Sequence, residues 1–160
     1  MIIIDKDRTC CFTGHRELTE TKAFIKKRLK KEIEKLIKKG VIFFGAGGAL
    51  GFDTLAALTV LELKKKHPQI KLIMVLPCRE QAEKWSEADK QIYIGVLYKA
   101  DKVTYTSEHY HRGCMHVRNR RLVDFSKYCI AYLKEESGGT AYTVGYAREK
   151  GLEVINIADV

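Results

Sequence analysis

Short apolar segments rich in β-branched and aromatic residues alternate with segments of helical periodicity, and this alternation restricts the fold more than any other feature. Strands are predicted at residues 9–13, 41–45, 70–77, 102–106, 128–133 and 152–157, and helices at about 19–40, 52–66, 80–100, 115–125 and 137–150. Strands separated by helices pair in parallel through right-handed crossovers. Because the strands lack polar alternation, helices are expected on both sheet faces. The sequence therefore predicts a single α/β domain over residues 1–160, with a three-layer, Rossmann-like, doubly wound and mostly parallel sheet. Its strand order is not readable from the pattern.

The composition is that of a globular chain, with 46% apolar and 31% charged residues. No apolar run reaches the roughly 18 residues that a membrane span needs. The opening MIIID lacks a basic flank and is followed at once by charge, so no signal peptide is expected. Five scattered cysteines without a CxxC pair fit reduced thiols. We therefore expect a cytoplasmic protein.

Most of the net charge of +9 lies in one segment, because residues 19–40 hold nine Lys or Arg against three Asp or Glu. The apolar residues of that segment, from Ile25 to Ile37, follow helical spacing, and the lysines occupy the other directions. A solvated helix face explains this pattern more simply than a nucleic-acid surface, since basic charge alone supports only non-specific attraction. Nucleic acid is thus an unlikely partner on this reading.

Chemistry-bearing residues follow the predicted strands, and ligands of such folds bind beyond the carboxyl ends of the strands. Two glycine loops, 45–51 and 137–140, each lead into a helix start, where backbone N–H groups and the helix dipole favour a phosphate. The predicted ligand-binding residues are Thr13, Gly14, His15, Arg16, Gly45, Gly47, Gly48, Asp53, Pro77, Gln81, Trp85, Arg112, Arg118, Asn119, Gly138, Gly139 and Thr140.

Several of these residues have a simpler structural explanation. Asp53 would either stabilise a helix N-terminus or hold a ribose hydroxyl. Trp85 would either pack or cover a base, with packing favoured. Thr140 would be an ordinary residue of a helix start. His15 and Arg16 directly follow a buried strand, which favours a functional role for both.

The segment RGCMHVRNRR at 112–121 raises further alternatives. His109, His111, Cys114 and His116 are zinc ligand types, but their spacing matches no standard structural site, so no metal is predicted. A Cys114 nucleophile is also disfavoured because no orienting acid is identifiable.

Helical spacing places the arginines of this segment on different faces of the predicted helix. It places Met115, Arg118, Asn119 and Leu122 on one face, with Arg121 pointing elsewhere and Arg120 expected to pair with Asp124. Arg118 and Asn119, with Arg112 from the loop, are the predicted ligand contacts.

Five segments in order resemble the YpsA-like family of bacterial and phage proteins. They are CCFTGHR, FFGAGGALGFDTLAA, LPCREQAEKWSEAD, RGCMHVRNRRLVD and SGGTAYTVGYAREKGLEVINI, and together they span residues 9 to 157. That family is similar in fold to the SLOG superfamily, named for the DNA-processing Smf/DprA proteins and the "lonely guy" cytokinin-activating enzymes. The resemblance implies a Rossmann-like domain whose superfamily relatives bind nucleotides or nucleotide-derived ligands, and it makes a homodimer plausible.

Two loops show how far the resemblance extends. The glycine loop resembles that of the DNA-processing proteins at Gly47, Gly48, Gly51 and Asp53, but their final histidine is absent, so DNA binding is not carried over. Met115, His116 and Arg118, and later Gly138, Gly139 and Thr140, match the phosphoribohydrolase segments M-H-E-R-K and PGGxGTxxE. Asn119 replaces the lysine, and Thr143 stands where the catalytic glutamate is expected.

The leading hypothesis is therefore a module that senses or sequesters a phosphorylated nucleoside-type ligand at the carboxyl edge of the sheet, with no cofactor. Backbone amides near Gly47–Gly48 and Gly138–Thr140 would hold phosphate, with charge from Arg16 and Arg118. The alternative is a nucleotide N-glycosidase of the phosphoribohydrolase type; enzymatic activity is left open because the catalytic glutamate is missing. A second alternative is nucleic-acid binding through the lysine-rich helix.

Overall fold

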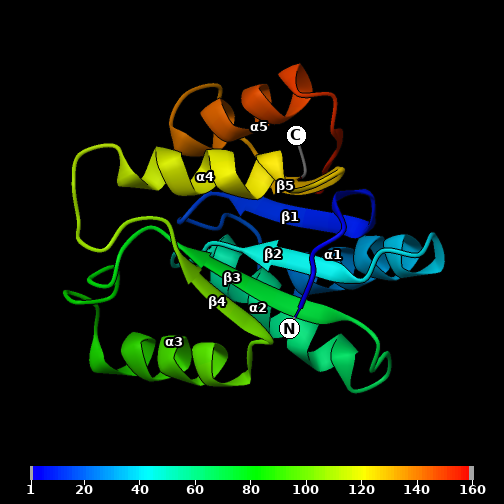
Figure 1. The fold of residues 1–160 in the computed structure, drawn as a ribbon, viewed down its shortest axis with the longest axis horizontal. Coiled ribbons are helices and arrows are strands. Elements are labelled where there is room, and N and C mark those ends of the chain that lie inside the picture. Colours follow the sequence, from blue (N-terminus) through cyan, green and yellow to red (C-terminus); the bar gives the residue numbers. More distant parts are fainter. Residues whose placement is uncertain (1, 159–160) are drawn as a thin grey trace.

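Six strands form one parallel sheet in the computed structural model, which describes residues 2–158 (Figure 1). The strands are β1 (Thr9–Gly14), β2 (Phe43–Ala46), β3 (Lys71–Leu76), β4 (Lys102–Tyr105), β5 (Tyr128–Tyr132) and β6 (Glu153–Asn156). The helices are α1 (Lys22–Lys38), α2 (Phe52–Lys64), α3 (Glu87–Lys99), α4 (Cys114–Asp124) and α5 (Gly139–Glu149), with a 3-10 turn at Lys6–Arg8. The predicted parallel α/β fold is confirmed.

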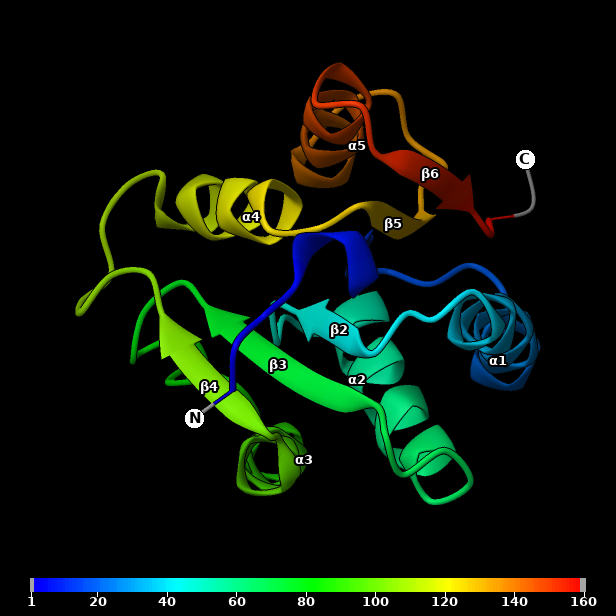
Figure 2. The same ribbon diagram turned by 45° about the vertical axis from the view of Figure 1, so that its right-hand side comes forward.

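The strand order is β4-β3-β2-β1-β5-β6, and all five pairings are parallel. The chain therefore builds outward from β1 in one direction through β4, then returns and builds in the other direction from β5. Figure 2 shows the result, with α1, α2 and α3 along one face of the sheet and α4 and α5 along the other. The reversal lies between β1 and β5, and in doubly wound sheets ligands bind at this switch point.

The hydrophobic core is divided by the sheet into two layers, because successive side chains of a strand point to opposite faces. In β1, Cys10 and Phe12 join the larger layer under α1 and α2, whereas Cys11 joins the layer under α4 and α5. Ile2 and Ile4 of the N-terminal segment add to the second layer, where only two helices cover the sheet. All five cysteines are buried and unbridged.

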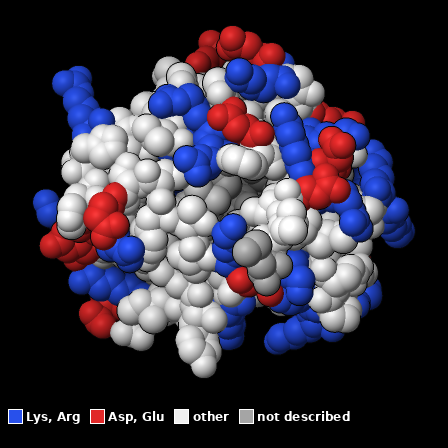
Figure 3. All heavy atoms as spheres, in the orientation of Figure 1, with Lys and Arg blue, Asp and Glu red and all other residues white. Residues whose placement is uncertain are grey.

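The lysine-rich segment forms α1 with its apolar residues buried, as its periodicity predicts. Ile25, Leu29 and Ile33 lie against the core, and Lys26 and Lys30 both contact Glu62 of α2 at 2.5 and 2.8 Å. On the face seen in Figure 3, basic side chains are interspersed with acidic ones. Part of the positive charge is therefore neutralised locally by α2.

The helix predicted from residue 80 begins only at Glu87. Ser86 provides its N-cap, since the hydroxyl of Ser86 accepts a hydrogen bond from the amide of Asp89 at 3.2 Å. The preceding residues 79–85 form turns that follow the carboxyl end of β3. No helix of the described residues is long and apolar enough to cross a membrane.

Gly51 directly precedes the first residue of α2, and its conformation leads to a prediction about stability. Its φ is +81°, and an added Cβ would lie 2.2 Å from the carbonyl oxygen of Arg16. Gly51→Ala should lower the free energy of unfolding by about 3 kcal/mol or more, because the backbone conformation and a collision with main chain both oppose it. Gly113 at the start of α4 is the matched control, with φ +88° but open space around it, and Gly113→Ala should cost about 1 kcal/mol. Urea denaturation measures both, and equal losses would contradict the prediction.

Candidate functional site

A cleft of about 280 Å³ opens where the loops after β1, β2 and β3 meet the starts of α4 and α5. It lies at the carboxyl ends of the strands, beside the switch point between β1 and β5. Its lining residues are Thr13, Gly14, Arg16, Ala49, Leu50, Asp53, Gln81, Trp85, Met115, Arg118, Asn119, Gly139 and Thr140. Residues from five separate segments of the chain thus converge on one hollow.

The cleft brings together most of the residues selected from the sequence, from Thr13 and Arg16 near the N-terminus to Gly139 and Thr140 near the C-terminus. The selected residues that do not line it are His15, Gly45, Gly47, Gly48, Pro77, Arg112 and Gly138. Gly138 precedes the first residue of α5. Arg112 is exposed on its loop, so the expected delivery of this side chain into the cleft is not seen.

Gly47 and Gly48 lie behind the cleft wall and leave space for other side chains. A Cβ on Gly47 would lie 2.4 Å from Nη1 of Arg118, and one on Gly48 would lie 2.8 Å from Leu76. Gly45 faces Leu122 of α4, where a Cβ would lie 3.0 Å from the leucine side chain. These three glycines therefore allow close packing and do not themselves line the cleft, so the expected direct contact of Gly47–Gly48 with phosphate is not supported by the cleft lining.

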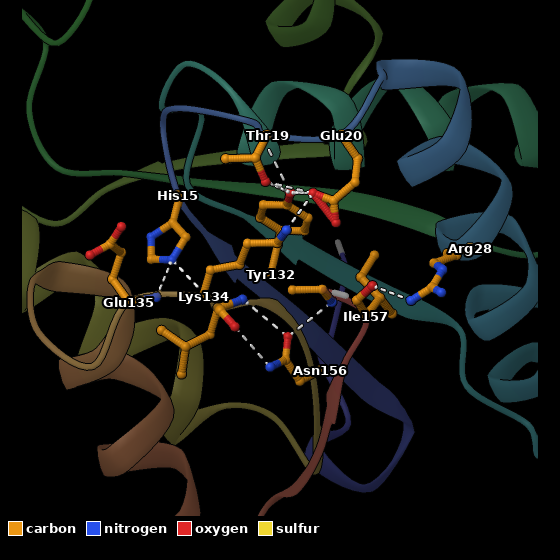
Figure 4. A network of polar contacts seen from close by, with 11 residues as sticks. His15, Thr19, Glu20, Arg28, Tyr132, Lys134, Glu135, Asn156 and Ile157 are labelled. Atoms are coloured by element: carbon orange, nitrogen blue, oxygen red, sulfur yellow. Dashed lines mark hydrogen bonds and ion pairs between the residues drawn. The ribbon is translucent and has the colours of Figure 1, made fainter. Parts of the chain in front are cut away.

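His15 ties the loop after β1 to the loop after β5 (Figure 4). Its Nε2 accepts hydrogen bonds from the amides of Lys134 at 2.8 Å and Glu135 at 3.2 Å. An acceptor nitrogen must be unprotonated, and burial lowers the pKa of His15 while nearby Glu135 raises it. His15 thus positions the segment that leads to Gly139 and does not face the ligand space.

A second group of contacts holds the same segment, the loop after β5, in place (Figure 4). Tyr132 donates to Glu20, which also forms an ion pair with Lys134 at 2.9 Å. The amide of Leu133 donates to the side chain of Asn156 at 3.0 Å. The wall of the cleft made by the start of α5 therefore rests on a well-anchored loop.

Arg118 is the central cation of the cleft and is only 4% exposed. Nη1 donates to the carbonyl oxygen of Gly47 and lies 3.5 Å from Oε1 of Gln81, while Nε donates to Asn119 at 2.7 Å. Nη2 donates to the Met115 sulfur at 3.8 Å, its one hydrogen-bond partner within residues 2–158. Burial lowers the pKa of Arg118, partly opposed by the negative charge of Asp53. Its remaining N–H groups are thus oriented in a poorly solvated space.

Asp53 is the one carboxylate among the described residues that line the cleft. It lies in the first turn of α2 and is 7% exposed. Burial raises its pKa from the usual 3.8 to about 6, although Arg118 and the backbone of Ala49 both lower it. A carboxyl group with this pKa is partly protonated near neutral pH and can accept or donate a hydrogen bond.

Helix starts at the cleft differ from those elsewhere in the fold. The cap residues of α2, α4 and α5 are Gly51, Gly113 and Gly138, and none forms a side-chain cap. By contrast, Thr21 caps α1 and Ser86 caps α3. The amides of Phe52 and Cys114 donate to the carbonyls of His15 and His111, at 3.2 and 3.1 Å. Other first-turn N–H groups that no side chain caps can bind water or a ligand, and the helix dipole makes their surroundings positive.

Three lining residues, Ala49, Leu50 and Met115, are absent from the sequence-derived set. Ala49 and Leu50 lie inside the glycine loop, and their place between Gly48 and Gly51 is the only signal for them. Met115 shares the predicted helix face with Arg118 and Asn119, so the helical spacing was sufficient to include it.

Other side chains of the 109–124 region are engaged outside the cleft. His109 contacts Glu80 at 2.8 Å, His111 contacts Ser107 at 2.8 Å, and the ring of His116 lies edge-on to that of Tyr142 with centroids 4.6 Å apart.

The expected ion pair of Arg120 with Asp124 is absent from these described residues. Arg120 instead donates to Tyr142 at 3.2 Å, and Asp124 accepts from Tyr146 at 2.7 Å. A tertiary contact with α5 thus replaces a pairing within α4. Thr143 is buried in α5, and its hydroxyl donates to the carbonyl of Gly139 at 2.8 Å.

Comparison with known proteins relates this site to a family. Residues 10–155 match the family model YpsA, described as the YspA SLOG family. A UPF0398 protein of Halalkalibacterium halodurans is 32% identical over 140 residues, covering 86% of this chain and 72% of that protein. The uncharacterised SPbeta prophage-derived protein YoqJ of Bacillus subtilis is 33% identical over 138 residues, covering 78% of this chain and 81% of that protein.

Among solved structures, the fold is similar to that of DNA processing protein A from Helicobacter pylori. The TM-score is 0.69 and the sequence identity 20%, and the match covers 93% of this chain and 64% of that chain. That structure is described in terms of a single-stranded DNA binding mode. At this identity the likeness establishes the Rossmann-like fold.

The buried carboxyl of Asp53 generates a prediction about stability and pH. Because its pKa is higher in the folded than in the unfolded chain, the folded protein binds the proton more tightly, and stability falls as pH rises from about 4 to 6. Asp53→Asn should therefore raise the free energy of unfolding at pH 8 by about 1–3 kcal/mol and reduce its decline between pH 4 and 7. Urea denaturation across this range measures both. Glu17→Gln, at an exposed carboxylate, is the control. A loss of stability at pH 8 in Asp53→Asn would contradict the prediction.

Proposed function

Because the chain belongs to the YpsA SLOG family, a family of binding domains, we propose that its cleft binds a phosphorylated nucleoside-type ligand, as a sensing or sequestering module. The observation that carries the proposal is the position of Arg118. A guanidinium that is only 4% exposed and donates to a backbone carbonyl has lost most of its hydration. An anionic ligand would restore the lost interactions, because hydrogen bonds between charged groups are strong in such surroundings.

The uncapped helix starts support a phosphate in the same cleft. Gly139 and Thr140 begin α5 and line the hollow, and Arg16 contributes a cationic side chain from the opposite loop. A phosphate placed between them would accept hydrogen bonds from backbone N–H groups and from the Thr140 hydroxyl. Arg118 would contribute further charge through the N–H groups of Nη2.

The polar groups next to Arg118 support a sugar. Asp53 and the Asn119 side chain provide a carboxylate and an amide at the same wall of the cleft. Vicinal hydroxyl groups of a ribose both donate and accept hydrogen bonds, so they match this pair. A simple inorganic anion would offer Asp53 no hydroxyl group and would bring a like charge towards it.

Arg118 provides the direct test. Isothermal titration with adenosine 5′-monophosphate (AMP) should show binding that weakens at least about tenfold in Arg118→Lys, because lysine cannot replace the fixed guanidinium donors. Thr140→Val should weaken binding while leaving the buried cation in place, which covers the case in which Arg118→Lys misfolds. Arg121→Lys, on the same helix but exposed, should bind as the parent protein does.

The same mixtures separate binding from hydrolysis. Chromatography after incubation with purine and pyrimidine monophosphates should show no released base. Sustained release would instead support the N-glycosidase alternative. An absence of binding to every nucleoside phosphate, or equal affinity in parent and Arg118→Lys, would refute the proposal.

Single-stranded nucleic acid is a second candidate, favoured by the fold likeness to a protein whose structure is described by its single-stranded DNA binding mode. This likeness counts against the sequence-based expectation that nucleic acid is an unlikely partner. Net charge of +9 also favours a polyanion.

Oligonucleotide binding distinguishes the two candidates. If DNA binds through the lysine-rich helix, its affinity should fall steeply between 50 and 200 mM salt, weaken in Lys27→Gln/Lys31→Gln, and be unaffected by Arg118→Lys and by excess AMP. If DNA uses the cleft, AMP should compete with it. Fluorescence anisotropy with a labelled single strand measures each case, and undetectable binding at low salt would dismiss this candidate.

A further inference from the structure

A second hollow adjoins the cleft and shares a wall with it. This outer hollow has a volume of about 580 Å³, twice that of the inner cleft. Arg16, Gln81, Trp85 and Met115 line both. Because the same four side chains face both spaces, one ligand can extend from the inner cleft into the outer hollow without crossing a protein barrier.

The two hollows differ in chemistry. The inner cleft holds Arg118, Asp53 and Thr140, which are suited to charged and hydroxyl groups. The outer hollow contains none of these and adds the aromatic ring of Tyr110 to that of Trp85, with Glu80, Glu83, Lys84 and Arg16 also along its lining. The indole of Trp85 packs edge-on to Tyr93 with centroids 5.2 Å apart, so its orientation is fixed. Flat aromatic groups of a ligand favour stacking on such side chains.

The side chain of Tyr110 takes no part in the hydrophobic core. Its side chain is 66% exposed, and it is absent from both hydrophobic core clusters. A large aromatic residue left exposed at the rim of a hollow is typical of a recognition surface.

The loop that carries Tyr110 is nevertheless held in place. Arg79 pairs with Glu108 at 2.7 Å, and Glu80 contacts both His109 Nδ1 at 2.8 Å and the amide of Tyr110 at 3.0 Å. These crossed contacts join the loop after β3 to the loop after β4. The outer hollow therefore has two aromatic side chains on loops that are joined to each other by these contacts.

We propose that the outer hollow binds the nucleobase of the ligand, stacked against Trp85 and Tyr110, while the phosphate and ribose occupy the inner cleft. This inference rests on the function proposed above and adds to it that recognition requires a ring system. A sugar phosphate alone fills only the inner cleft. The occupant is accordingly a nucleotide and not a phosphosugar.

Three small molecules test separately the contributions of the phosphate and the base to binding. AMP carries phosphate, ribose and base, ribose 5-phosphate lacks the base, and adenosine lacks the phosphate. Trp85 is the only tryptophan of the chain, so its fluorescence reports directly on the shared wall. AMP should bind at least about tenfold more tightly than ribose 5-phosphate, and at saturation it should quench Trp85 emission more strongly, because only AMP brings a base that can stack on the indole.

Variants in the outer hollow provide the second part of the test, read by calorimetry. Tyr110→Ala, which changes the outer hollow alone, should weaken AMP about five- to tenfold and leave ribose 5-phosphate unaffected. Trp85→Leu, on the wall shared by both hollows, should weaken AMP by a similar factor and ribose 5-phosphate by less. Tyr98→Ala is the matched control, because Tyr98 is 89% exposed on α3 and lines neither hollow. Tyr110→Ala removes an exposed side chain, so it should fold even if Trp85→Leu does not.

Each outcome separates the two proposals. Equal affinity for AMP and ribose 5-phosphate, both sensitive to Arg118→Lys, would overturn the base-binding role and leave the phosphate site intact. Loss of both ligands in Tyr110→Ala would show a general effect on the cleft and would also overturn it. If neither AMP nor ribose 5-phosphate binds the parent protein, the proposed function fails and this inference fails with it.

Discussion

The contact between the Arg118 guanidinium and the backbone carbonyl of Gly47 organises the cleft. It joins α4, from the second half of the chain, to the loop after β2, from the first half. The approach requires glycine at 47, because a side chain there would occupy the position of the guanidinium. Removing a charge from water is costly unless partners compensate, and here Gly47, Asn119 and the nearby charge of Asp53 provide them. The cleft therefore contains a positive charge, the Arg118 guanidinium, that its partners hold in a fixed position.

The surrounding elements maintain this arrangement through the topology of the sheet. Growth in both directions from β1 places the starts of α2, α4 and α5 around one switch point. These helix starts lack side-chain caps, whereas α1 and α3 have them. At the start of α5 no side chain caps the backbone donors, and in the same cleft the ionised form of Asp53 lowers the stability of the folded protein near neutral pH. This local concentration of unfavourable features is typical of a binding site.

The match to the family model and the likeness to a solved structure establish different things about this chain. The match to the YpsA model covers nearly the whole sheet and relates the chain to proteins of bacteria and a prophage. The likeness to DNA processing protein A concerns the fold, and the chain corresponds to 64% of that protein's length. The inner and outer hollows are formed by this chain's own side chains, which the fold alone does not determine.

The sequence alone determined the element order, the parallel sheet, the buried face of α1 and the shared face of Met115, Arg118 and Asn119. These features are local, because periodicity and strand-end position follow from neighbouring residues. Residues after β1, β2 and β3 were expected at one edge because parallel strands end together.

Only the tertiary structure decided the strand order, the role of His15, and the replacement of an Arg120–Asp124 pair by contacts with α5. It also showed that Gly47 admits Arg118, and that Tyr110 and Trp85 share a second hollow. Each of these depends on residues 20 to 120 positions apart in the chain. Such contacts carry no sequence period, since they arise from the way helices cross the sheet and not from the spacing of residues within one element.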